Sequence, residues 1–137
     1  MPGTAPTPYL LLPGTAAEAL TRYREVFGGD VELHTYGAFG RADGPGDAIA
    51  HGILTGPVLL FGADAGADED AFSSTGLLLS LLGTAEPAVL RGWFDSLADG
   101  GRVLDPLVER PWHAWDGRVR DEFGVTWLIG WEPAAGA

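Results

Sequence analysis

Residues 56–62 read Gly-Pro-Val-Leu-Leu-Phe-Gly, and residues 124–130 read Gly-Val-Thr-Trp-Leu-Ile-Gly. The two stretches share their flanking glycines and an apolar centre. A shorter motif, Gly-Thr-Ala, occurs at residues 14–16 and again at residues 83–85. Internal repetition of this kind predicts that the chain contains the same supersecondary unit twice.

Each half of the chain predicts a strand, a helix and three further strands. In the first half, Thr15 and Glu18 form a capping box at the start of a helix whose apolar stripe runs to Phe27. In the second half, Thr84 is expected to cap a helix with a similar stripe, and a Gly-Gly pair ends both helices. The expected strands are residues 9–12, 31–36, 48–54 and 58–61, and then 76–82, 103–112, 114–120 and 125–131.

The predicted fold class is α+β, with two βαβββ repeats that form a half-open mixed sheet around a cleft. One domain is expected over residues 8–132, with repeat one at about 8–62 and repeat two at about 76–131. Residues 1–7 are expected to be a disordered tail and residues 133–137 a frayed one. The apolar run 76–82 indicates a buried strand. The acidic segment 62–74, with Asp64 and Glu69, indicates a solvated linker.

Composition excludes several classes of chemistry. The chain has no cysteine, and all eight of its basic residues are arginine, so thiolate and Schiff-base lysine chemistry are excluded. Its formal net charge of −11 argues against binding to nucleic acid or to an anionic membrane surface. No apolar run reaches the length of a membrane span, and the N-terminus does not have the pattern of a secretory signal. We therefore expect a cytoplasmic protein.

Three segments carry a family resemblance. Residues 22–29 (Arg-Tyr-Arg-Glu-Val-Phe-Gly-Gly), residues 120–129 (Arg-Asp-Glu-Phe-Gly-Val-Thr-Trp-Leu-Ile) and residues 50–52 (Ala-His-Gly) resemble the vicinal oxygen chelate, or glyoxalase/bleomycin resistance/dioxygenase, superfamily and its PhnB-like branch. Members of this superfamily include lyases, isomerases, dioxygenases, thiol transferases and proteins that sequester antibiotics, so the resemblance does not select a reaction. Similar proteins commonly form homodimers, for which the edge strand at residues 104–108 is a plausible contact.

The resemblance also implies where a divalent metal would be bound. Its ligands would lie on the first, fourth, fifth and eighth strands, which here correspond to Pro8 or Tyr9, to Leu60, to Gly76 or Leu77, and to Leu128. Leucine has no donor atom, and the three histidines, His34, His51 and His113, have no close sequence spacing. We therefore expect neither a metal nor another cofactor.

Candidate ligand-binding residues follow from strand alternation. If Leu60 and Leu128 face the cleft, then Val58 and Thr126 do so too, while Phe61 and Trp127 face the helices. The rim is expected to contain Trp112, His113 and Trp115, because aromatic side chains give flat contact surfaces for planar ligands. Tyr36, Ser80 and Arg120 are further candidates.

His51 is the candidate catalytic residue, because an imidazole can act as a general base near neutral pH. Two functions remain open. The first is a metal-free small-molecule binding protein that sequesters an aromatic or apolar metabolite. The alternative is an enzyme, such as a lyase or isomerase, that uses His51 as an acid/base in the same cleft, with or without a divalent metal.

Overall fold

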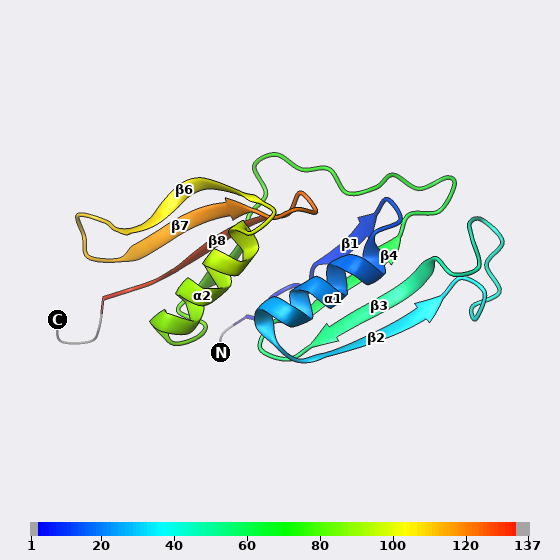
Figure 1. Ribbon diagram of the computed structural model, residues 1–137, viewed down its shortest axis with the longest axis horizontal. Helices are drawn as coiled ribbons and strands as arrows, with labels where there is room; N and C mark the ends of the chain where they lie inside the picture. Colours follow the sequence, from blue (N-terminus) through cyan, green and yellow to red (C-terminus); the bar gives the residue numbers. More distant parts are fainter. Residues whose placement is uncertain (1–2, 134–137) are drawn as a thin grey trace. The chain divides into compact units, whose positions relative to one another are not determined.

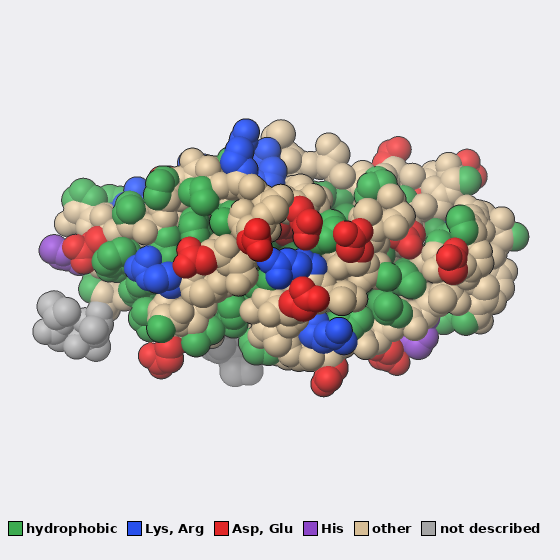
Figure 2. Space-filling model, viewed as in Figure 1, with side chains coloured by type: hydrophobic (Ala, Val, Ile, Leu, Met, Phe, Trp, Pro, Cys, Tyr) green, Lys and Arg blue, Asp and Glu red, His purple; other side chains and the backbone are tan. Residues whose placement is uncertain are grey.

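The computed structural model describes residues 3–133 of the chain. The chain divides into two compact units, residues 1–72 and residues 73–137 (Figure 1). The expected frayed C-terminal tail lies, apart from Pro133, outside the described residues, as do the first two residues of the expected N-terminal tail. In Figure 2 carboxylate side chains are spread over the visible surface of both units, in keeping with the net charge of −11.

Unit one has a four-stranded sheet and one helix. Its strand order is β1-β4-β3-β2, in which β1 runs parallel to β4 and the other pairs are antiparallel. The helix α1 lies across one face of this sheet (Figure 1). The elements in chain order are β1 (Tyr9–Leu12), α1 (Ala16–Phe27), β2 (Asp30–Thr35), β3 (Ile49–Thr55) and β4 (Leu60–Asp64).

Unit two repeats this topology. Its strand order is β5-β8-β7-β6, with β5 parallel to β8, so the prediction of two βαβββ repeats is confirmed. β6 lies at a sheet edge, where its one proline, Pro106, is tolerated. The elements in chain order are β5 (Leu79–Leu82), α2 (Pro87–Ala98), β6 (Arg102–Glu109), β7 (Trp115–Arg120) and β8 (Thr126–Trp131).

Both helices bury the predicted apolar stripe, but neither has the predicted cap. Thr15 makes no side-chain cap hydrogen bond, and the N–H of Ala16 donates instead to Oδ1 of Asp64, 2.9 Å away at the end of β4. α2 begins at Pro87 with Glu86 as its N-cap, two residues beyond Thr84. Proline suits the first helical position because its fixed φ matches the helix and the missing N–H has no partner there.

The acidic segment after β4 also departs from the prediction. Asp64 belongs to β4 and is only 6% exposed. Its burial is stabilised because both carboxylate oxygens accept backbone N–H groups, one from Ala16 and one from Ile49 at 2.8 Å. β5 begins at Leu79 rather than at residue 76 and is half exposed, so the prediction of a fully buried strand there is wrong.

Strand pairing decides which side chains face the helix. A Cβ at Gly52 would lie 2.4 Å from Cδ1 of Leu20 on α1, so Gly52 and its strand partner Gly62 face the helix. Side chains alternate along a strand, so Leu60 faces α1 and Phe61 faces away from it. The expected orientation of these two residues is therefore wrong.

The error comes from a one-residue difference between the repeats. In unit one Gly62 faces α1, whereas in unit two the buried side of β8 is formed by Trp127 and Ile129, so the matching Gly130 lies on the opposite face. A slip of one residue exchanges the two faces of a strand. Leu60 thus takes the place of Trp127, and each of them is 1% exposed.

Candidate functional site

Three ring side chains gather on the face of the first sheet that lies away from α1, which we call the helix-free face. The Tyr9 hydroxyl is 2.9 Å from Nδ1 of His51, and the two rings stack with centroids 5.5 Å apart. The ring of Phe61 lies 6.0 Å from that of Tyr9 and 5.5 Å from that of His51. Tyr9 is 46% exposed. We call this group the Tyr9–His51–Phe61 cluster.

The sheet register brings the cluster together from three strands. Tyr9 on β1 is the cross-strand partner of Phe61 on β4, and Phe61 is the partner of Ile53 on β3. His51 precedes Ile53 by two residues and therefore lies on the same face. Directly across from it on β2 is His34, whose Nε2 is 3.2 Å from a carboxylate oxygen of Glu32.

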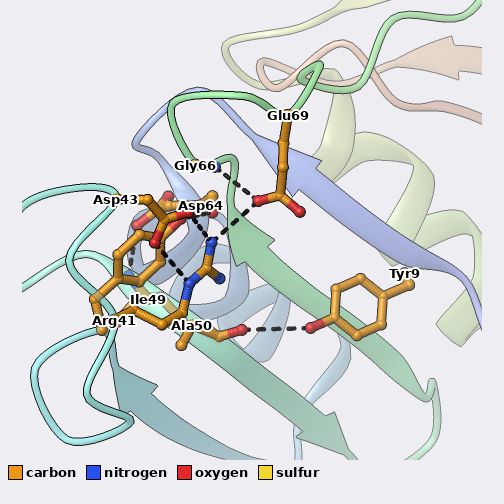
Figure 3. Close-up of polar contacts among 9 residues, drawn as sticks. Tyr9, Arg41, Asp43, Ile49, Ala50, Asp64, Gly66 and Glu69 are labelled. Carbon is orange, nitrogen blue, oxygen red and sulfur yellow. Dashed lines mark hydrogen bonds and ion pairs between the residues drawn. The ribbon is translucent and has the colours of Figure 1, made fainter.

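The surroundings of Tyr9 keep its hydroxyl protonated. Burial raises the pKa of the Tyr9 phenol, the negative charge of Glu69 raises that pKa further, and the positive charge of Arg41 lowers it in part. The Tyr9 hydroxyl also donates to the backbone carbonyl oxygen of Ala50 at 3.5 Å (Figure 3), and which of Tyr9 and His51 donates in their own hydrogen bond depends on the imidazole tautomer. The contact with Tyr9 engages Nδ1 of His51, so Nε2 is the ring nitrogen left to contact a ligand.

Arg41 joins two loops beside this cluster (Figure 3). Its Nε is 2.9 Å from a carboxylate oxygen of Asp43, its Nη2 is 3.3 Å from one of Glu69, and its guanidinium carbon lies 4.0 Å from the centre of the Tyr36 ring. The hydrogen bond from Arg41 lowers the pKa of Asp43. Glu69 also accepts the N–H of Gly66 at 2.8 Å, so it ties the exposed segment after β4 to Arg41.

The remaining candidates of unit one are core residues. Tyr36 is completely buried, and its hydroxyl donates to the backbone carbonyl of Asp64 at 2.5 Å. Val58 is buried, and Leu60 packs on the α1 side of the sheet. None of these three side chains belongs to the Tyr9–His51–Phe61 cluster.

In unit two the structure brings the three predicted rim residues together. Trp112, His113 and Trp115 line one open cavity of about 950 Å³. Trp131 and three glutamates also line it. The other candidates lie elsewhere: Arg120, Thr126, Leu128 and Ser80 are on the helix-free face of the second sheet, where Nε of Arg120 donates to Oγ1 of Thr126 at 3.1 Å.

Sequence reasoning did not select Tyr9, Phe61 or Trp131 as ligand-binding residues. The sequence pattern predicts Phe61 on the opposite face of the sheet, and it indicates Tyr9 only as a metal-ligand position. A tyrosine on one strand and a histidine on another carry no local sign of contact, because 42 residues separate them along the chain. Trp127, Ile129 and Trp131 are each two residues apart, so strand alternation predicts that Trp131 shares the helix side with the other two.

The residues do not fit the metal centre that the family resemblance implies. Tyr9 has the single side-chain oxygen among the corresponding positions, since Leu60, Leu77 and Leu128 have no donor atom and Pro8 and Gly76 offer none from a side chain. Within residues 3–133, no three His, Asp or Glu side chains gather closely enough to hold a metal ion. We derive no chemical step through a metal.

Comparison with known proteins relates both units to one class of fold. Protein PA1353 from Pseudomonas aeruginosa is 30% identical, with a TM-score of 0.77 over 95% of this chain and 98% of that one. A PhnB protein from Bacillus cereus is 19% identical, with a TM-score of 0.72 over 93% and 99% of the two chains. Protein YjdN from Escherichia coli K12 is 25% identical over 90% of this chain and 92% of its own. No family model matches the chain.

The same fold class includes structures of a lactoylglutathione lyase, with a TM-score of 0.53, and of a glyoxalase/bleomycin resistance/dioxygenase domain, with a TM-score of 0.58. The chain belongs to one family with protein PA1353, and its fold is that of the PhnB and glyoxalase/bleomycin resistance proteins. Over the described part of the chain, no helix is both long and apolar enough to span a membrane.

Proposed function

We propose that the protein binds a small planar aromatic molecule on the helix-free face of its first sheet. The observation that carries this proposal is the hydrogen bond of 2.9 Å between Tyr9 and His51 within a cluster of three rings. The rings offer a flat apolar surface for stacking, and the paired polar atoms offer one directed hydrogen bond. The superfamily fold is compatible with such a role but does not select it.

The binding contribution of each group follows from its chemistry. An aromatic contact contributes about 1 kcal/mol beyond area burial, so loss of the Phe61 ring should weaken binding roughly fivefold or more. Removal of the Tyr9 hydroxyl, with its ring retained, removes the hydrogen bond that orients the His51 ring. A ligand hydrogen bond of about 1 kcal/mol would then be weakened by a similar factor.

The test is isothermal titration calorimetry with 2-naphthol, a planar probe with one hydroxyl. Phe61→Ala and Tyr9→Phe should each weaken binding, whereas Trp112→Ala, at an exposed aromatic position in unit two, should not. Native mass spectrometry of the purified chain should in addition reveal a retained organic mass. The proposal fails if 2-naphthol gives no saturable heat, or if only Trp112→Ala weakens its binding.

The same pair also supports an acid/base enzyme as a second candidate function. With Nδ1 hydrogen-bonded to Tyr9, Nε2 is the ring nitrogen of His51 that is available to exchange a proton with a bound molecule. An enzyme that transfers protons should exchange carbon-bound hydrogen of its retained ligand for deuterium in D₂O. His51→Ala should abolish that exchange while Phe61→Ala weakens binding; exchange that persists in His51→Ala rules this function out.

We also propose that the protein is a homodimer and that it acts in the cytoplasm. β6 is an edge strand, and its side chains Val103 and Val108 are 42% and 40% exposed. An edge with exposed valines supports pairing with a second copy, since pairing would give the unpaired backbone groups hydrogen-bond partners and bury the valine side chains.

A further inference from the structure

The cavity in unit two has a different chemical character from the Tyr9–His51–Phe61 cluster and shares no residue with it. Its volume of about 950 Å³ lies within the usual range of small-molecule sites. The loop before α2, the hairpin between β6 and β7, and the end of β8 contribute its walls. The site is therefore assembled by elements that the sheet of unit two holds together.

Three indole rings form the aromatic part of this cavity. Trp115 and Trp131 stack with their centroids 5.6 Å apart and their planes 16° from parallel. The guanidinium carbon of Arg91, on α2, lies 5.2 Å from the centre of the Trp115 ring and 5.7 Å from that of Trp131. These rings thus already attract a cation of the protein itself. Trp112 is 64% exposed and presents a further indole to a ligand.

The hairpin that carries Trp112 is held in an uncommon conformation. His113 has a φ of 72°, and among residues 3–133 it is the one non-glycine residue with a positive φ. Hydrogen bonds between the backbones of Arg110 and Ala114, at 2.7 Å, and of His113 and Arg110, at 2.8 Å, fix the turn. Such strain is often found where a side chain must be held for binding.

The charged part of the cavity is acidic. Glu86, Glu109 and Glu132 line it, and no arginine does. The neighbouring Arg110 is already paired, with guanidinium contacts of 2.9 Å to Asp105 and 2.7 Å to Asp116. The three carboxylates outnumber the guanidinium of Arg91 that lies over the Trp115 and Trp131 rings, so the charge around the cavity is net negative, in a chain of net charge −11.

We propose that this cavity is a second ligand site that takes a small organic cation, of the alkylammonium class, against Trp112 and the Trp115–Trp131 pair. Indole faces attract quaternary ammonium groups, and the carboxylates favour a cation over a neutral molecule of the same shape. Neither feature would favour an anionic ligand.

The experiment uses choline and its neutral carbon isostere 3,3-dimethylbutan-1-ol, followed by the indole N–H signals of the ¹⁵N-labelled full chain. Choline should shift the signals of Trp112, Trp115 and Trp131 saturably, leave those of Trp93 and Trp127 in place, and bind at least about fivefold more tightly than the alcohol. Signals are assigned from single Trp→Phe variants.

Three variants complete the test. Trp112→Ala and the double variant Glu109→Gln/Glu132→Gln, all at exposed positions, should weaken choline binding at least about fivefold, with unchanged circular dichroism. His51→Ala should leave it unchanged. Equal affinity for the alcohol, absence of a saturable shift, or loss of choline binding in His51→Ala would each overturn the proposal. Binding of 2-naphthol at the first sheet is measured separately and can fail independently.

Discussion

Replacement of Asp121 by asparagine should destabilise unit two by about 3 kcal/mol. Asp121 is 6% exposed, and its Oδ1 accepts backbone N–H groups from Phe123 at 2.9 Å and Val125 at 3.1 Å. Its Oδ2 accepts Nε1–H of Trp127 at 2.8 Å, and Trp127 is 1% exposed. The carboxylate thus fixes the turn between β7 and β8 and orients the largest buried side chain of unit two.

The magnitude follows from this donor set. Asparagine keeps one oxygen for the two backbone donors, but its NH₂ group then faces the indole N–H of Trp127. One hydrogen bond to a charged acceptor is lost, at about 1.5–3 kcal/mol, and a buried donor is left unpaired, at about 1–3 kcal/mol. Because these two costs overlap, a net loss of about 3 kcal/mol is expected, with a fall in Tm of roughly 10 °C.

Urea unfolding monitored by circular dichroism measures this loss, and Asp95→Asn on the exposed side of α2 is the matched control, with an expected change within about 0.5 kcal/mol. In a double-mutant cycle with Trp127→Phe, which removes the indole donor, the coupling energy should be about 1–2 kcal/mol. A loss below about 1 kcal/mol for Asp121→Asn, or strict additivity with Trp127→Phe, would refute the reasoning.

Two further predictions concern the sheet faces. Leu60→Glu should lower the free energy of unfolding by about 4 kcal/mol or more, since it places a charge at a 1% exposed position that faces α1. Leu128→Glu should lower it by under about 1 kcal/mol, because Leu128 is partly exposed and lies across from the exposed Arg118. Equal losses in urea unfolding would show that the faces are wrongly assigned. For the homodimer, sedimentation velocity should give about twice the monomer mass at tens of micromolar, and Val108→Lys should shift the chain towards monomer; a monomer in the unaltered chain contradicts it.

Much of the architecture was readable in the sequence, because it rests on local patterns that occur twice. The apolar stripe that ends at Phe27 has helical spacing, and the Gly-Gly pair after it adopts the positive φ values that end a helix, 83° at Gly28 and 107° at Gly29. The turn chemistry of the hairpins is equally local. Order, type and approximate bounds of most elements therefore followed without tertiary information, and so did the fold class.

Helix starts were harder to predict, because their hydrogen-bond partners are distant in sequence. The first N–H of α1 is satisfied by Asp64, 48 residues away, and not by Thr15 beside it. A capping box is a local way to satisfy the first N–H groups of a helix, and it does not form here because a buried carboxylate on a neighbouring strand accepts the N–H instead. The sequence places Asp64 in a solvated segment for the same reason, because nothing near it in the chain indicates that β4 carries its side chain into the core.

The sequence by itself determined that the chain repeats a βαβββ unit, that it has neither thiol nor lysine amine, and that it carries a net charge of −11. Only the tertiary structure decided which residues share a face, because alternation along a strand has a period of two and a shift of one residue between the repeats exchanges the faces. That shift moved Leu60 into the core and Phe61 onto the helix-free face. There the strand register, which no local pattern encodes, places it against Tyr9 and His51.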